Sequence, residues 1–170
     1  MSKAFTKEDD LGELPPLPRL VSPLAPGTRN YLTPAGSRTL HGELAHLKEA
    51  RRPPLVASSR QDSGAREELR LIDQRIDYLE QSLRSAEVVQ PPAKTDGRVR
   101  FGATVTVRSH GKEETDYRIV GMDETNLDRN WVSWQSPIAR ALMNTAIGQR
   151  VHFKIPSGET GLEIVGIAYE

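Results

Sequence analysis

The sequence predicts an α+β protein in which an antiparallel two-helix coiled-coil hairpin is followed by a small antiparallel sheet domain with one helix. Apolar residues recur at helical spacing on both sides of a short polar stretch, "ASSRQDSGAREEL" at 57–69. The stretch "QPPAKTDG" at 90–97 then ends the helical pattern. Beyond it apolar and polar residues alternate, as in half-buried strands. We therefore expect an arm at 31–89, a linker at 90–97 and a sheet domain at 98–170.

Residues 1–30 are predicted to form a flexible, Pro-rich leader. Their apolar residues follow no steady period, and prolines break any helical pattern. Such polar, Pro-rich tails are typical of flexible segments, and an arm that binds a partner is the alternative. The prolines concerned are Pro15, Pro16, Pro18, Pro23 and Pro26.

The composition excludes several function classes. The chain has 23 Lys and Arg against 23 Asp and Glu, and the balance also holds within the arm and within the sheet domain, so we expect weak or no binding of free DNA. Cysteine is absent, which excludes a disulfide framework, a thiolate zinc site and a thiol nucleophile. No apolar run approaches the roughly 20 residues of a membrane span. We expect a soluble, monomeric, cytoplasmic protein without a membrane partner.

The arm is predicted from capping and from a heptad pattern. Thr33 and Pro34 form an N-cap followed by a proline at the first helical position, where its missing N–H costs nothing. Only one narrow stripe of each helix is apolar, so we expect the two stripes to face each other; packing on a globular core is the alternative. Pro53 and Pro54 should kink the first helix or open a turn of it. The stripes are Leu40, Leu44 and Leu47 on the first helix and Leu69, Ile72, Ile76, Leu79 and Leu83 on the second.

The sheet domain is predicted from period-two alternation. The stretches "SHGKEE" and "PSGETG" supply hairpin turns between strands. Ser136 precedes Pro137 as the cap of a short helix, with Ile138, Ala141 and Leu142 on one face. The alternating apolar positions are Val99, Phe101, Ala103, Val105 and Val107, then Tyr117 and Ile119, then Val151, Phe153 and Ile155, and finally Val165, Ile167 and Tyr169.

Several motifs resemble those of the bacterial Gre transcription elongation factors, GreA and GreB. They run from "YLTPAG" through "RRPPLV", "IDQRIDYLEQSL", "VRFGATVTV" and "YRIVGMDETN" to "SPIARALMNTAIGQRV", "PSGETGLEIV" and "IAYE". The resemblance covers about Tyr31 to Tyr169, and the block from Ser136 to Val151 is the most specific part.

The resemblance implies a division of labour. In Gre factors an FKBP-like carboxy-terminal domain binds RNA polymerase, and the coiled coil enters its secondary channel. Acidic residues at the tip help to hold a second magnesium ion in the polymerase active site, which then cleaves a backtracked transcript. By this resemblance the protein is a regulator without catalytic residues or a tightly bound cofactor of its own, and it meets nascent RNA only indirectly. The polymerase-binding residues would be Ser136, Pro137, Ile138, Ala139 and Arg140.

The chain departs from the family at the tip. The family motif "GDLSEN" is absent, and roughly a dozen residues are missing between "RRPPLV" and "IDQRI", which shortens the arm by about 9 Å. The remaining candidates to assist magnesium are Asp62, Glu67 and Glu68. Alternatively, Asp62 starts a turn and the two glutamates lie in the first turn of the second helix. We therefore expect channel occupancy with weak or no stimulation of cleavage, as in the relatives called Rnk.

Other residues leave alternatives open. Arg51 and Arg52 would contact RNA or polymerase, or else pair with acidic residues of the arm. Trp131 and Trp134 are either interface anchors or half core and half exposed edge. A peptidyl-prolyl isomerase is a second function class, suggested by the implied fold alone, and would need an aromatic-lined pocket. The four histidines His41, His46, His110 and His152 are scattered, so we expect no metal pair.

Overall fold

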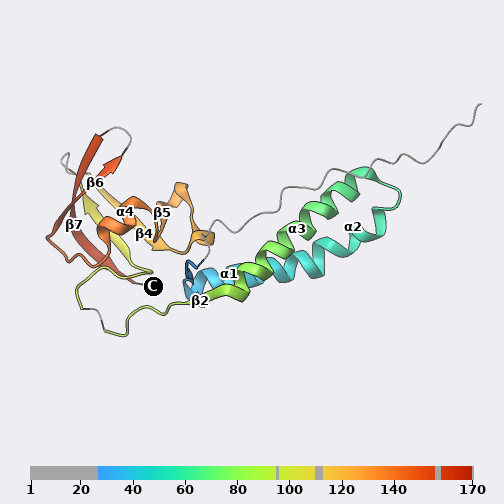
Figure 1. Cartoon of the computed structure of the whole chain (residues 1–170), viewed down its shortest axis with the longest axis horizontal. Helices are drawn as coiled ribbons and strands as arrows, with labels where there is room; N and C mark the ends of the chain where they lie inside the picture. Colours follow the sequence, from blue (N-terminus) through green and yellow to red (C-terminus); the bar gives the residue numbers. More distant parts are fainter. Residues whose placement is uncertain (1–26, 95, 110–112, 156–157, 170) are drawn as a thin grey trace, which may run out of the picture.

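The computed structural model describes residues 27–94, 96–109, 113–155 and 158–169, with the backbone alone at 153–155 and 158–160. A helical hairpin projects from a sheet domain (Figure 1). Most of the expected leader, 1–26, lies outside these residues, as do 110–112 and 156–157 in the two expected hairpin turns. Within the described part of the chain, no helix is long and apolar enough to cross a membrane.

The first side of the hairpin is one helical rod with a widened turn. Helix α1 (Pro34–His46) continues through the π-helical turn η1 (Leu47–Arg51) into α2 (Arg52–Ser58). The Thr33 hydroxyl caps α1 by accepting a hydrogen bond from Gly36 N at 3.0 Å, as predicted. Pro53 has no N–H to donate, and its ring would clash with the carbonyl four residues earlier. The π turn, in which Arg52 N donates to Leu47 O, opens the helix just before the prolines and confirms the predicted disruption.

The second side is α3 (Ser63–Ser85), which packs antiparallel to the first. Ile72, Ile76 and Leu79 are buried, and Leu32, Leu40 and Leu79 form the core at the arm's root. Leu69 and Leu83, at the ends of the predicted stripe, are half-buried. The predicted hairpin is therefore confirmed, and the leucines do not belong to the core of the sheet domain. Among the described residues, the ion pairs that cross the hairpin include Glu43 with Arg75, Lys48 with Glu80, Arg51 with Glu68, and Arg52 with Asp73.

A small parallel ribbon closes the root of the arm. Strand β1 (Asn30–Leu32) pairs with β2 (Ala86–Val88), so that Leu32 lies opposite Val88. The Asn30 side-chain amide donates to Ser82 O at 3.0 Å and to Ser82 Oγ at 3.1 Å. The ribbon has only three residues per strand and no alternating pattern, and sequence periodicity did not predict it.

The described residues of the sheet domain form five strands in the order β5-β4-β3-β7-β6. The strands are β3 (Thr104–Arg108), β4 (Glu114–Val120), β5 (Trp131–Ser133), β6 (Arg150–Ile155) and β7 (Gly158–Ala168). The prediction of an antiparallel sheet is wrong at one edge, because β5 pairs parallel with β4. Two short 3-10 turns, η2 (Met122–Glu124) and η3 (Leu127–Arg129), carry the chain between them, and Asn130 turns it back with a φ of 53°.

Helix α4 (Pro137–Leu142) contributes Ala139 and Leu142 to the core of the sheet domain. Val99, Phe101, Ala103, Val105 and Val107 are buried there as predicted. The predicted pattern fails within β7: Leu162 and Ile164 are buried, and Val165 lies outside the core cluster. The register against β3 shifts at this point, since Thr106 pairs with Gly166 and Val107 with Ile164. A bulge at residue 165 therefore switches the inward face to Ile167 and Tyr169.

Candidate functional site

The acidic pair Asp123 and Glu124 joins the arm to the sheet domain. The Asp123 carboxylate accepts hydrogen bonds from the hydroxyls of Tyr78 and Ser82 on α3. The Glu124 carboxylate accepts from Thr33 N at 2.8 Å, from the Thr33 hydroxyl and from Gly121 N at 3.1 Å. Burial, and then the bond to Asp123, raise the pKa of Tyr78. One 3-10 turn, η2, thus fixes both helices of the arm against the sheet domain.

Close packing supports this joint. The Tyr31 ring lies 5.1 Å from the Trp134 ring and 5.7 Å from the Phe101 ring, centroid to centroid. A Cβ on Gly36 would lie 2.0 Å from Glu124 Oε1, and one on Gly121 would lie 2.1 Å from Tyr31 O. At Gly121 the obstacle is backbone, so glycine is required there, whereas at Gly36 a Cβ would displace the Glu124 side chain.

The tip of the arm is a short capped turn. Asp62 is the N-cap of α3, and its Oδ1 accepts a hydrogen bond from Gly64 N at 2.8 Å. Gln61 N and Asp62 N both donate to Ser58 O, at 3.0 and 3.1 Å. Because α3 begins at Ser63, Glu67 and Glu68 are its fifth and sixth residues. The alternative is therefore wrong in placing these glutamates in the first helical turn, whereas Asp62 does begin the turn as that alternative stated.

Each candidate carboxylate at the tip has a partner within the chain. Asp62 caps α3, Glu68 forms an ion pair with Arg51, and Glu67 lies 3.8 Å from Arg70 Nη1. Both glutamate side chains are about half exposed, so each ion pair contributes little to stability. Among the described residues, no group of three or more Asp, Glu, His or Cys could hold a metal ion.

Arg51 and Arg52 pair with acidic residues of the arm, which was one of the two predicted alternatives. Arg51 bonds Glu68 across the hairpin, and Arg52 Nε lies 2.6 Å from Asp73 Oδ1. The Asp73 carboxylate raises the pKa of Arg52. All four side chains remain about half exposed, so a partner can still compete for the arginines.

The motif "SPIAR" forms the start of α4. The Ser136 hydroxyl caps the helix by accepting from Ala139 N at 3.2 Å, and Ala139 is fully buried. Ile138 is half-buried against the core, whereas Pro137 and Arg140 are exposed. The five predicted residues are thus brought together, but Pro137 and Arg140 offer most of the accessible surface.

Comparison with known proteins identifies the family. The family model described as "Transcription elongation factor, GreA/GreB, C-term" matches residues 94–169. The chain is 36% identical over 153 residues to transcription elongation factor GreA of Francisella philomiragia, covering 82% of this chain and 96% of that protein. The chain belongs to the GreA/GreB family of transcription elongation factors.

Two further relatives of this GreA/GreB protein are informative about coverage. Transcription elongation factor GreB of Neisseria meningitidis is 38% identical over 157 residues, which cover 84% of this chain and 95% of the relative. A solved GreA/GreB factor from Nitrosomonas europaea matches 82% of this chain and 99% of its own, with 22% identity and a TM-score of 0.41. That score is too low for structural detail to be transferred.

The two tryptophans of the GreA/GreB protein have different surroundings. Trp134 packs at the joint, against Tyr31. The half-buried Trp131 lies under two guanidinium groups, those of Arg118 at 4.9 Å and Arg129 at 5.4 Å from the ring centroid. Among the described residues, the linings of two cavities, one at the root of the arm and one beside Arg108, include no Phe, Tyr or Trp.

Sequence reasoning missed the joint residues Asp123 and Glu124. Their partners on the arm are 41 to 91 residues away along the chain, and no periodic pattern connects such positions. The only available signal was the acidic pair itself, within the family-like block "YRIVGMDETN".

Proposed function

We propose that this elongation factor binds RNA polymerase through its sheet domain, places its arm in the secondary channel, and occupies that channel with weak or no stimulation of transcript cleavage. The observation that carries the proposal is the state of the tip, where the Asp62 carboxylate caps α3 and both glutamates are ion-paired. The factor thereby acts on backtracked or arrested complexes as a regulator of the polymerase and not as an enzyme. This is the role expected of a non-cleaving, Rnk-type factor.

The tip residues do not fit a magnesium site. Magnesium requires nearly octahedral oxygen ligands at about 2.0–2.1 Å, and carboxylates that already serve as a cap and in ion pairs would have to be rearranged. In the family the ion belongs to the polymerase, so this factor needs no cofactor of its own. Recruitment of that ion is not part of the role proposed for this factor.

Arm length supports the same proposal. Helix α3 has 23 residues and is therefore about 35 Å long. Against the family pattern the arm lacks about six residues per helix, or about 9 Å. A deficit of several ångströms exceeds the tolerance of a metal–ligand bond, which is a few tenths of an ångström.

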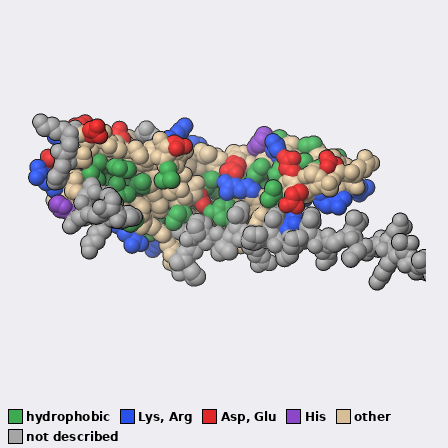
Figure 2. All heavy atoms as spheres, turned by 90° about the horizontal axis from the view of Figure 1, so that it is seen from above, with side chains coloured by type: hydrophobic (Ala, Val, Ile, Leu, Met, Phe, Trp, Pro, Cys, Tyr) green, Lys and Arg blue, Asp and Glu red, His purple; other side chains and the backbone are tan. Residues whose placement is uncertain are grey.

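The polymerase contact is assigned to α4 and to its exposed residues Pro137 and Arg140. The FKBP-like topology of this domain stays a prediction. On the face of the arm that Figure 2 shows, acidic and basic side chains lie close together, so this face offers no continuous basic surface for free DNA. We therefore place the factor in the cytoplasm with polymerase as its partner, with nascent RNA reached only through the channel.

The test of this proposal uses stalled, backtracked elongation complexes. Wild-type factor is compared with Asp62→Asn and with a Glu67→Gln, Glu68→Gln double variant. Asn is about as good an N-cap as Asp, so the first variant keeps the tip folded while it removes the charge. We expect slow cleavage that neither substitution changes. Robust cleavage by the wild type that disappears in Asp62→Asn would refute channel occupancy as the mechanism.

Binding is measured in the same samples by co-sedimentation with polymerase. Arg140→Glu should weaken binding, because it reverses an exposed charge on α4. Arg150→Glu is the matched control, since Arg150 is also exposed but lies on β6. A wild-type factor that does not bind polymerase, or an equal loss of binding in both variants, would contradict the assigned surface.

A further inference from the structure

The segment before β5 carries the most exposed large apolar side chain among the described residues. All residues at 125–130 are exposed, and Leu127 is 87% exposed. The next large apolar residue in this order, Ile147, is 59% exposed. A single exposed leucine is common on protein surfaces, so a role for Leu127 has to be argued from how it is held and from what surrounds it.

Hydrogen bonds close this segment into a rigid loop. Asn126 N donates to Trp131 O at 3.0 Å, and Trp131 N donates to Asn126 O at 2.8 Å. Inside the loop, the Asn126 side chain accepts a hydrogen bond from Arg129 N at 3.1 Å, and Asn130 has a left-handed conformation with a φ of 53°. Leu127 is therefore presented to solvent on a fixed backbone. A partner that buries this side chain does not have to order a flexible loop first.

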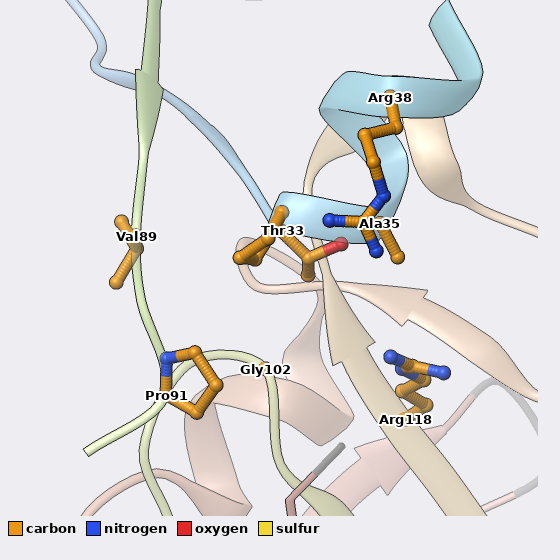
Figure 3. Close-up of a pocket in the computed structure, with 8 residues that line it drawn as sticks. Thr33, Ala35, Arg38, Val89, Pro91, Gly102 and Arg118 are labelled. Atoms are coloured by element: carbon orange, nitrogen blue, oxygen red, sulfur yellow. The ribbon is translucent and has the colours of Figure 1, made fainter. Parts of the chain in front are cut away.

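The same loop contains residue types that are typical of protein interfaces. Trp131 is half-buried, and the guanidinium of Arg129 lies 5.4 Å from its ring centroid. Arg118, which lies 4.9 Å from the same ring centroid, also lines the cavity at the root of the arm (Figure 3). Tryptophan and arginine are enriched among the residues that dominate binding between proteins. Because an apolar side chain gains free energy only in an apolar environment, Leu127 favours a protein partner with an apolar pocket.

The loop is continuous with the surface assigned to polymerase. It leads directly into β5, and β5 packs against α4. Ser136 N, at the cap of α4, donates to Ser133 O at the end of β5 at 2.9 Å. A protein interface of ordinary size takes about 20–30 residues from each partner, and α4 has only six residues. A partner that binds α4 therefore has to cover neighbouring segments of the sheet domain as well.

We propose that the loop at 125–131 is a second contact between this factor and RNA polymerase, in which Leu127 enters an apolar pocket of the polymerase. The inference rests on the proposed function, because it adds a contact to the same complex. The two contacts differ in chemistry, since Arg140 on α4 contributes a charge and Leu127 contributes apolar surface. Salt screens interactions between exposed charges, so added salt should weaken the contact of Arg140 more than that of Leu127.

The first test measures the affinity of the full chain for RNA polymerase. Leu127→Ala should weaken binding by roughly tenfold to a hundredfold, the effect of losing a buried leucine side chain. The melting temperature should not change, because Leu127 is almost fully exposed in the factor alone. Leu127→Met keeps the apolar volume and should retain most of the binding. Ile147→Ala is the matched control, since Ile147 precedes β6, and β5 and β6 form opposite edges of the sheet.

The second test locates the contact by cross-linking. The sequence contains no cysteine, so Leu127→Cys and Ile147→Cys each supply a single thiol for a photoactivated cross-linker. The cross-linker at position 127 should capture a polymerase subunit, and the one at position 147 should not. Capture of a second copy of the factor in the absence of polymerase would show that the loop joins two copies, and it would overturn the proposal.

The outcomes separate this inference from the proposed function. Suppose that the wild type binds polymerase, that Arg140→Glu weakens binding and that Leu127→Ala does not. The proposed function then stands and the second contact is refuted. Equal weakening by Leu127→Ala and Ile147→Ala would also refute it. A wild type that does not bind polymerase would refute both.

Discussion

Replacement of Gly36 by alanine provides the sharpest test of the joint, because two physical effects predict opposite signs. Helix propensity alone favours Gly36→Ala by up to about 1 kcal/mol. In the structure, however, the new Cβ would lie 2.0 Å from Glu124 Oε1 and 2.1 Å from Glu124 Cδ. The Glu124 carboxylate must therefore leave its position.

The cost follows from the hydrogen bonds that Glu124 would lose. It accepts from Thr33 N at 2.8 Å and Gly121 N at 3.1 Å, besides the Thr33 hydroxyl. At about 1.5 kcal/mol each, the lower end for bonds to a charged group, the two backbone bonds alone represent about 3 kcal/mol. After the propensity gain of about 1 kcal/mol, the free energy of unfolding should fall by at least about 2 kcal/mol. For a chain of this size that is a melting temperature lower by about 4–8 °C.

The matched control is Gly42→Ala, on the same helix. A Cβ at Gly42 meets nothing within 4 Å, so this variant should gain up to about 1 kcal/mol. Urea unfolding followed by circular dichroism at 222 nm measures both variants. In a Glu124→Ala background the Gly36→Ala cost should vanish, which gives a coupling free energy that a double-mutant cycle resolves. Stabilisation by Gly36→Ala equal to that of Gly42→Ala would refute the joint as described.

The remaining predictions concern the seam of the arm and its pH dependence. Ile76→Asp should melt the arm at a cost above about 3 kcal/mol, because Ile76 is 7% exposed and the charge would have no partner in the seam. Circular dichroism should show a loss of helicity; the neighbouring Asp77→Asn is the control, and retained helicity in Ile76→Asp would count against the seam. Tyr78 has a raised pKa, so its contribution to stability is complete below about pH 10 and is lost as pH rises further. Tyr78→Phe should therefore be less stable than wild type at pH 8 but lose less stability between pH 9 and 11; parallel pH profiles would contradict this.

Local signals in the sequence predicted much of the fold. The caps at Thr33 and Ser136 depend on one side chain and the next three backbone amides, so they can be read from adjacent residues. The heptad seam is equally local in each helix, and an antiparallel pairing is the short way to bury both stripes. The disruption before Pro53 follows from the covalent structure of proline itself.

The features that were missed depend on distant partners. The parallel direction of β5 is determined by two 3-10 turns and by Asn130 in the left-handed conformation. An alternation of apolar and polar residues predicts neither of these features. The bulge at residue 165 shifts the inward face of β7 by one residue, which period-two reasoning cannot locate. At the tip, the sequence predicted the candidate residues but not which of them form ion pairs. Arg51 and Glu68 lie on different helices, so their contact depends on how the two helices pair.

The parallel ribbon of β1 and β2 makes the arm a modular insertion. The chain enters the arm at Leu32 and leaves it at Val88, and these two residues lie opposite each other. Deletion or insertion of seven residues in each helix would keep the heptad register and leave the ribbon and the joint in place. Each such paired step alters the length by about 10 Å. The fold can therefore accommodate arms of different length without a change in the ribbon or the joint.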